Sequence, residues 1–217
     1  MIKLIIMKKS IILSFAFLLI TQLAFAQYLG IKGGLTFSRM NVGTAANEKL
    51  RFGYHGGAFY NIPLSQAFSI QPEVVFTTKG TRIEFDLDNY SGKSTLRHNY
   101  IDIPVLAVLK FGDPFEIMAG PYLGFLLSSN FQAEVDNNSL NVELTRESFR
   151  GIDYGAALGF ALNFGAIQTG AIYYLGIRDI SESDAANMLL GDPKNRYLQL
   201  FIAFRIGNYQ NDETVNP

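Results

Sequence analysis

Apolar and polar residues alternate with a period of two along the chain from residue 28 onward, and no segment after that point shows a helical period. In residues 28–38 the odd positions are Leu, Ile, Gly, Leu and Phe, whereas the even positions after Tyr28 are small or polar. This alternation is typical of β-strands whose two faces meet different surroundings. It predicts eight strands, over residues 28–38, 51–62, 68–79, 100–110, 115–128, 152–164, 167–177 and 197–206.

Residues 101–127, IDIPVLAVLKFGDPFEIMAGPYLGFLL, form the most apolar stretch outside the start of the chain. A helix crosses a bilayer with about 20 apolar residues, so the stretch is long enough to do so. Pro104, Pro114 and Pro121 oppose a helix, because an interior proline removes a hydrogen bond and clashes with the preceding turn. We therefore expect a hairpin with a tight turn at 112–114. Strand prolines usually mark edges or bulges, so a local break or bulge is expected at Pro104 or Pro121.

The connections between the predicted strands alternate between long and short. The long ones are 41–50, 86–96, about 20 residues around 132–148, and 178–195; the short ones are 63–67, 112–114 and a turn near Gly165. Outer-membrane barrels have long loops outside the cell and short turns in the periplasm. A sheet that spans lipid must also close, since open edges leave backbone groups unpaired in hydrocarbon. The sequence thus predicts an all-β fold, an eight-stranded antiparallel up-and-down transmembrane β-barrel with both termini in the periplasm.

A soluble sandwich or a lipocalin-like barrel would also have two-faced strands, but would turn the apolar face inward, whereas a membrane barrel turns it outward. The second face here is rich in glycine and charge, which suits a narrow, filled lumen. By parity the inward charges are Lys32, Arg51, Lys79, Arg205, Glu73, Asp102, Glu116 and Asp153, four positive and four negative, with partners left open. The outward aromatic residues are Phe37, Tyr54, Tyr60, Phe68, Phe76, Phe111, Phe115, Phe164, Tyr173 and Phe204, several of them near strand ends where interfacial girdles lie.

The first 26 residues have the form of a secretory signal. Lysines precede an apolar run from Ile11 to Leu19, and Ala24-Phe25-Ala26 offers a cleavage site before Gln27. Met7 is an alternative start to Met1, and an N-terminal anchor helix is the alternative interpretation. Cleavage leaves a barrel domain at 27–207 and a polar tail at 208–217.

Composition narrows the function classes further. Loss of the signal's three lysines leaves 15 basic and 19 acidic residues, a charge of −4, which gives no footprint for nucleic acid. The chain has no cysteine, so an exported form has no disulfide framework and no thiol chemistry.

Several segments resemble the PorT-like outer-membrane β-barrel proteins of Bacteroidetes. They are GIKGGLTFS, GYHGGAFYNIPLSQAFSIQPEVVFTTKG, YIDIPVLAVLKF, AGPYLGFLLS, DYGAALGFAL and LQLFIAFRI, between about Tyr28 and Ile206. The resemblance implies an eight-stranded barrel in the outer membrane of a Gram-negative bacterium. It implies little else, since most relatives have no assigned activity, although a founding member linked to protein secretion suggests a role in that process. The tail after Ile206 departs from barrels that end on an aromatic residue.

Candidate chemistry is sparse. His98 with Ser94 and Asp102 is the nearest set to the His, Ser and carboxylate of lipid-modifying barrels, but nothing in the sequence marks Ser94 as activated. Asp86, Asp88 and Asn89 have calcium-loop spacing without the closing acidic residue of a twelve-residue loop. The glycines of GIKGG and YHGG lack the strand-to-helix context of a phosphate loop. We expect no catalytic, cofactor-binding or metal-binding residues, and no cofactor.

The expected function is that of a non-enzymatic outer-membrane scaffold. Eight strands give an interior just wide enough for side chains to fill, which opposes a pore. The working surface would be the long loops, above all 129–150 and 178–195, with membrane lipid around the barrel and a protein as the possible partner. The alternatives are a part in protein secretion across the outer membrane and, less favoured, a lipid-modifying enzyme.

Overall fold

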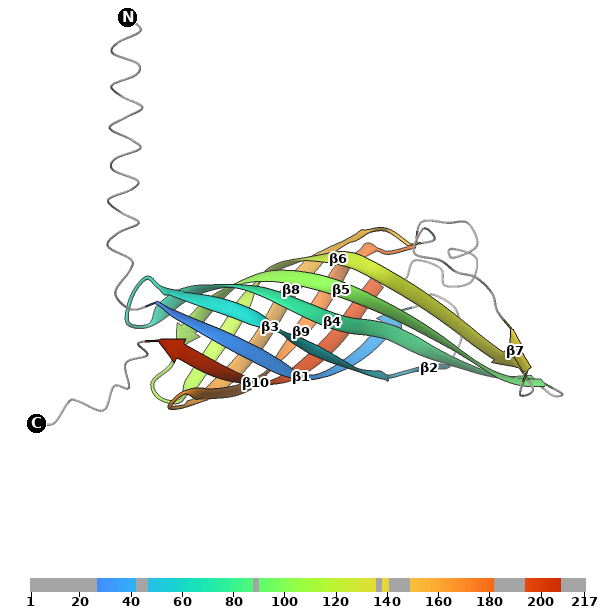
Figure 1. Cartoon of the computed structure of the whole chain (residues 1–217), viewed down its shortest axis with the longest axis horizontal. Helices are drawn as coiled ribbons and strands as arrows, with labels where there is room; N and C mark the ends of the chain where they lie inside the picture. The colour runs from blue at the N-terminus through green and yellow to red at the C-terminus, as the bar shows by residue number, and fades with distance from the viewer. Residues whose placement is uncertain are drawn as a thin grey trace, which may run out of the picture.

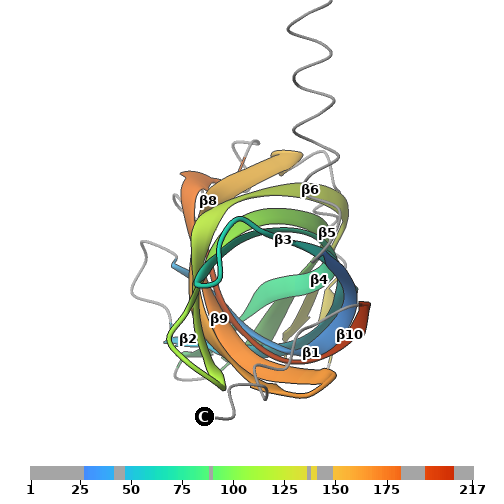
Figure 2. The ribbon, with the colours of Figure 1, turned by 90° about the vertical axis from the view of Figure 1, so that its left-hand side faces the viewer.

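Eight long strands pair edge to edge into a closed ring in the computed structural model, seen from the side in Figure 1 and end-on in Figure 2. They are β1 (Tyr28–Asn41), β3 (Arg51–Pro63), β4 (Phe68–Leu87), β5 (Tyr90–Lys110), β6 (Phe115–Val135), β8 (Ile152–Phe164), β9 (Ile167–Asp179) and β10 (Lys194–Gly207). The structure describes residues 27–41, 47–87, 90–135, 138–140, 149–181 and 194–207; the predicted signal at 1–26 and the tail at 208–217 lie outside them. The described residues include no helix long and apolar enough to cross a membrane.

The ring closes because the first and last long strands pair with each other. Every long strand is antiparallel to both neighbours, and Tyr28 of β1 lies opposite Gly207 of β10. A closed sheet has no free edge, so its backbone groups are paired around the whole circumference. The predicted eight-stranded antiparallel barrel is confirmed.

The three predicted tight turns all lie at the end of the barrel where β1 begins and β10 ends (Figure 1). They cover residues 64–67, 111–114 and 165–166. Gly112 and Gly165 have φ of 73° and 60°, a left-handed conformation that residues with a Cβ rarely adopt. Short turns at this end identify it as the periplasmic end of an outer-membrane barrel.

The opposite end is uneven, because three strands run on past the others. β4, β5 and β6 have 20, 21 and 21 residues, and the other long strands have 13 or 14. Two short strands pair with this projection, β2 (Asn47–Lys49) with β4 and β7 (Asn138–Leu140) with β6. The loop predicted at 86–96 is therefore wrong, since β4 runs to Leu87 and β5 begins at Tyr90. In residues 82–87 apolar and charged residues still alternate, but the apolar ones, Ile83, Phe85 and Leu87, have the parity opposite to that of the lipid-facing residues earlier in β4. Residues 90–95 of β5 show no apolar period. The pattern expected of strands in lipid therefore does not continue into the projection, whereas backbone pairing does not depend on side-chain polarity.

The apolar face points away from the lumen, as predicted. Phe52 and Ile202 are 69% and 67% exposed on the outside, and the predicted outward aromatic residues are exposed or half-buried. Seven of the eight predicted inward charges are buried, and the eighth, Arg51, is half-buried. An apolar exterior around buried charges excludes the soluble sandwich and the lipocalin-like barrel, and it is the arrangement of a barrel in lipid.

Prolines interrupt the backbone ladder in the barrel wall, as predicted. The β5–β6 pairs stop at Pro104↔Tyr122 and resume at Ala107↔Ala119, which leaves Pro121 outside the ladder. A similar gap around Pro104 separates two runs of β4–β5 pairs, and the register is unchanged across each gap. Pro72 interrupts the β3–β4 ladder in the same way, which was not foreseen. Proline has no N–H, so one ladder hydrogen bond is lost at each position.

Candidate functional site: the barrel lumen

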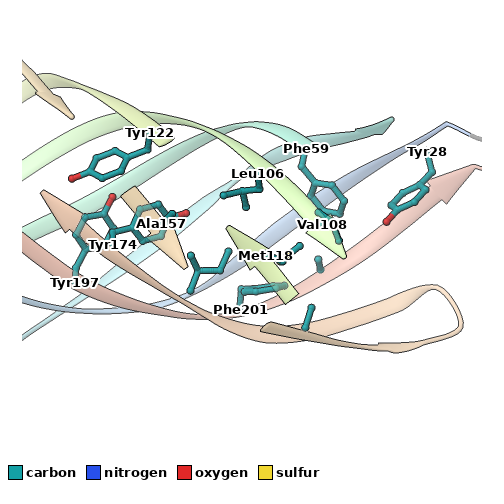
Figure 3. Packing of buried hydrophobic residues seen from close by; sticks show 13 residues of the cluster. Tyr28, Phe59, Leu106, Val108, Met118, Tyr122, Ala157, Tyr174, Tyr197 and Phe201 are labelled. Atoms are coloured by element: carbon teal, nitrogen blue, oxygen red, sulfur yellow. The ribbon is translucent and has the colours of Figure 1, made fainter. Parts of the chain in front are cut away.

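The lumen holds a cluster of apolar side chains, which extends from the periplasmic end to the middle of the barrel (Figure 3). Its members come from all eight long strands except β4: Tyr28, Phe59, Leu106, Val108, Met118, Tyr122, Ala157, Ala161, Ile172, Tyr174, Tyr197, Phe201 and Ala203. The sequence-based prediction missed this cluster, because it described the inward face by its glycines and charges. The signal was present in VLAVL, where Leu106 and Val108 occupy inward positions of β5.

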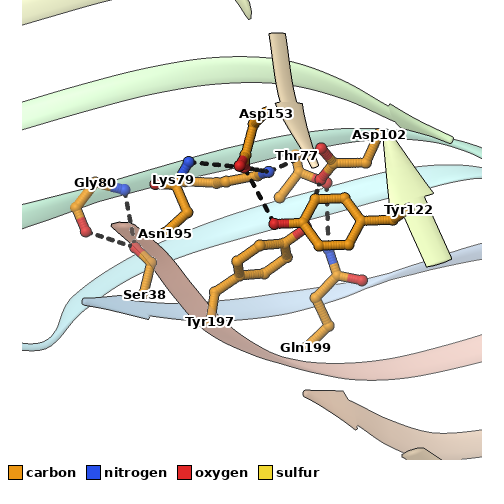
Figure 4. Close-up of polar contacts among 10 residues, drawn as sticks. All are labelled: Ser38, Thr77, Lys79, Gly80, Asp102, Tyr122, Asp153, Asn195, Tyr197 and Gln199. Atoms are coloured by element: carbon orange, nitrogen blue, oxygen red, sulfur yellow. Dashed lines mark hydrogen bonds and ion pairs between the residues drawn. The ribbon is translucent and has the colours of Figure 1, made fainter. Parts of the chain in front are cut away.

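Lys79 of β4 lies at the centre of the polar part of the lumen (Figure 4). Its Nζ is 2.8 Å from Oδ1 of Asp102 and 3.5 Å from Oδ2 of Asp153, and all three side chains have no exposed surface. The ammonium group also lies over the rings of Tyr100 and Tyr197, 4.3 and 4.4 Å from their centroids. One cation thus pairs with two carboxylates and lies on two aromatic faces, an arrangement that desolvated ammonium groups favour.

The two carboxylates of this network are held by further donors. Tyr197 Oη donates to Asp102 Oδ2 at 2.9 Å, while Tyr122 Oη and Asn195 Nδ2 donate to Asp153 Oδ2 at 3.1 and 2.8 Å. The two acids come from β5 and β8 and their donors from β6 and β10, so the network ties widely separated strands together. Buried carboxylates are stable only when they are paired and hydrogen-bonded in this way.

A second ion pair lies nearer the periplasmic end. Lys32 of β1 donates to Glu73 of β4, and Gln71 Nε2 donates to the other oxygen of Glu73 at 2.9 Å. Asn61 Nδ2 in turn donates to Gln71 Oε1 at 3.1 Å and to Ser69 Oγ at 3.0 Å. This row links β1, β3 and β4.

The remaining inward charges make hydrogen bonds to neutral groups. Glu116 accepts from Gln168 Nε2 at 3.0 Å, Arg51 donates to the carbonyl of Lys79 at 3.0 Å, and Arg205 donates to the carbonyl of Gly165. Among the described residues, the ion pairs of the eight predicted charges are therefore Lys32 with Glu73 and Lys79 with two aspartates. Parity placed these residues inside, but only the folded barrel shows which of them meet.

These contacts cross the lumen from wall to wall. β10 and β5 are four strands apart in either direction around the ring, and Tyr197 bridges them through Asp102. Gln199 of β10 likewise donates to Thr77 of β4 at 3.2 Å, three strands away. Hydrogen-bonded side chains thus span the lumen at that level.

The outer mouth is covered by residues from two connections. Phe149 and Ser181 form an isolated bridge, and the N–H of Arg150 donates to the carbonyl of Ile180 at 2.9 Å. The Phe149 ring lies edge-on to His98, with 4.5 Å between centroids, and His98 is fully buried. Phe149, which Ser181 holds through this bridge, thus covers the His98 ring.

The candidate catalytic set is not assembled by the fold. Asp102 is held by Lys79 and Tyr197, and His98 is four residues away from it on the same face of β5, about 13 Å along the strand. Within the described residues neither ring nitrogen of His98 has a hydrogen-bond partner. The side chain of Ser94 lies outside the described side chains. The other histidine, His55, has its Nδ1 3.2 Å from the hydroxyl of Thr36.

The described residues contain no group of three or more potential ligands that could hold a metal ion. Of the candidate calcium-loop residues, Asp88 and Asn89 lie outside the described residues, as does the side chain of Asp86.

The comparisons with known proteins agree with a membrane barrel. The profile of the family described as "Outer membrane protein beta-barrel domain" matches residues 25–182. No curated protein matches the chain. Ail, the attachment invasion locus protein of Yersinia pestis, is 15% identical over 84% of this chain and 100% of its own, with a TM-score of 0.46. Neisserial surface protein A is 9% identical over 82% of this chain and 97% of its own, with a TM-score of 0.46. OprG of Pseudomonas aeruginosa is 10% identical over 84% and 97%, with a TM-score of 0.45.

Proposed function

Because this chain belongs to the outer membrane protein beta-barrel domain family, and because side chains bridge its lumen, we propose that it is a non-conducting, non-enzymatic scaffold that binds a protein partner at its outer end. Export by the N-terminal signal delivers it to the outer membrane. The observation that carries the proposal is the bond from Tyr197 to Asp102 across the full width of the barrel. A lumen built in this way serves stability and leaves the outer surface for function.

The outer end supplies the surface that such a partner needs. β4, β5 and β6 project beyond the rest of the ring, flanked by β2 and β7 (Figure 1). Of the predicted loops 129–150 and 178–195, residues 129–135 belong to β6 and 178–179 to β9, and Phe149 and Ser181 from the remainder bridge each other. Binding residues often lie in segments that a rigid scaffold positions, and the barrel below is such a scaffold.

The absence of catalysis is part of the same proposal. A His-based hydrolase needs its carboxylate to orient the imidazole, and here Lys79 and Tyr197 hold Asp102. We expect His98→Ala to leave the lipid A composition of the outer membrane unchanged by mass spectrometry. A shift in acyl chain number in that variant would contradict the proposal.

The resemblance to PorT-like proteins of Bacteroidetes suggests one setting for a partner, the secretion of proteins across the outer membrane. A deletion strain that loses secreted cargo, with restoration by the wild-type gene, would support this setting. Normal secretion in that strain would show that the partner is not a component of this secretion process.

Planar-bilayer recording tests the closed lumen directly. We expect the purified protein to give no steady conductance above that of the protein-free bilayer, because hydrogen-bonded side chains cross the axis. A large-pore barrel purified in the same detergent serves as the positive control. Steady, large conductance from this protein would contradict a filled lumen.

A further inference from the structure

Arginines follow directly after the apolar exterior at the outer end of the barrel. On β1 the outward series Leu35 and Phe37 continues with Arg39, and on β10 the series Leu200 and Leu198 continues with Arg196. Arg39 and Arg196 are both exposed. The change from apolar to cationic on the same face marks the level at which lipid chains give way to headgroups.

These two arginines lie directly opposite each other across the β1–β10 ladder. Residues in that relation have Cβ atoms about 5 Å apart, so one phosphate group can accept hydrogen bonds from both guanidinium groups. Phe37, two positions nearer the membrane centre than Arg39, packs edge-on against Phe52 at 5.2 Å, and the exposed Phe52 ring faces the acyl chains.

A second pair lies on the neighbouring strands β4 and β5. Arg97 is opposite Gly80 and Arg82 is opposite Thr95, so the two arginines are diagonal neighbours about 7 Å apart. Both are exposed. On β5 the next outward positions toward the periplasmic end after Arg97 are Asn99 and then Ile101. Among the described side chains, neither Arg82 nor Arg97 nor Arg196 forms an ion pair with a carboxylate.

β3 lies between the two pairs, and the neighbours of its first residue, Arg51, show how close the pairs are. Arg51 lies opposite Ser38, the residue before Arg39, and its guanidinium donates to the carbonyl of Lys79, the residue before Gly80. The four exposed residues Arg39, Arg82, Arg97 and Arg196, here called the arginine arc, therefore occupy one sector of the outer rim, over strands β10, β1, β4 and β5.

We infer that the arginine arc binds the phosphate groups of phosphorylated lipid headgroups in the outer leaflet. Arginine presents a planar fork of N–H donors that matches phosphate oxygens, and one phosphate can accept from two guanidinium groups. A lipid fits better than a soluble anion because Arg39 and Arg196 directly continue the apolar outward series of β1 and β10. This lipid site is separate from the proposed protein-binding surface and does not depend on it.

The test uses the full-length protein in phosphatidylcholine nanodiscs, with diphosphorylated lipid A as the probe and native mass spectrometry of retained lipid as the measurement. We expect the variants R82Q/R97Q and R196Q each to retain lipid A about tenfold less well than the wild type, since each loses cations that attract an anionic headgroup. Lys110→Gln, which removes an exposed charge at the periplasmic end of β5, is the matched control and should retain lipid A normally. Heat-dependent migration on gels verifies that each variant is folded.

Two further probes distinguish a lipid site from a general anion site. Dephosphorylated lipid A should be retained poorly by the wild type and the variants alike, since the phosphate is the ligand. Equal retention of lipid A by the wild type and both arginine variants would overturn the inference. Tripolyphosphate or heparin binding to the wild type as tightly as lipid A would also overturn it, because the arc would then be a site for soluble polyanions.

Discussion

Lys79 is the residue on which the polar lumen depends most. Among the described residues it alone forms ion pairs with Asp102 and Asp153, and all three side chains are inaccessible to solvent. A buried ion pair can contribute little net stability, because desolvation costs about as much as the attraction returns. Loss of one partner is different, since it leaves the other charges buried without compensation.

We therefore expect Lys79→Met to lower the free energy of unfolding by about 3–5 kcal/mol in urea titrations of the protein in lipid vesicles. Lys110→Met, which changes an exposed residue near the 111–114 turn, is the matched control and should change it by less than about 0.5 kcal/mol. Replacing Asp102 and Asp153 by asparagine in the Lys79→Met background removes both uncompensated charges. Recovery of less than half the lost stability in that triple variant would show that packing, and not charge, explains the effect.

For single residues, the sequence predicted whether a side chain faces the lumen or the lipid, but not which other side chains it contacts. Period two assigns a face to every strand residue, which is why the eight inward charges are placed correctly. Which charges pair depends on strand order and on the stagger between distant strands, as for Lys79 with Asp153, 74 residues away. No local pattern encodes such a distance.

Prolines shape the wall at the level of single strands. Pro72, Pro104 and Pro121 belong to three consecutive strands, and Pro72 lies opposite Val105, the residue next to Pro104. Each lacks the N–H that would complete the ladder with the preceding strand, so three interruptions lie side by side in one patch of the barrel wall.

Replacing Pro121 with valine restores one donor. The register places position 121 opposite Val105, so we expect the new amide to donate to the Val105 carbonyl and to give a through-hydrogen-bond scalar coupling between them in NMR spectra. Pro114→Val, in the turn, should give no coupling to Val105. No coupling in the Pro121→Val variant would mean that the wall is held apart at this point by something other than the missing N–H.

At the level of elements the sequence predicted the strands well within the membrane and poorly beyond it. Inside lipid the outward residues must be apolar and the inward ones mostly polar, so each strand leaves a visible period. In the projection the outward parity of β5 carries polar residues such as Thr95 and Arg97, and in β4 the apolar residues change parity after Gly80, so the period expected in lipid does not continue.

For the whole molecule, closure of the sheet predicts resistance to detergent. The unboiled protein should migrate differently from the boiled protein on an SDS gel, because the closed ladder survives until heat disrupts it. The protein should also be recovered in the outer-membrane fraction after cell fractionation. Recovery as a soluble periplasmic protein would contradict the transmembrane architecture.

Because Tyr28 pairs with Gly207, β1 and β10 are neighbours in the closed ring like any other two strands, and no strand lies at an edge. The other seven contacts between long strands join strands that follow each other along the chain, and the β1–β10 contact has the same antiparallel geometry. A circular permutant that joins residue 207 to residue 27 through a short linker, and opens between Gly165 and Ala166, should therefore fold to the same barrel. Its heat-dependent gel shift should match that of the natural order, whereas a permutant opened inside β5 should lose it. The order in which the strands are translated would then be a property of the gene, and the barrel itself would depend only on which strands are neighbours.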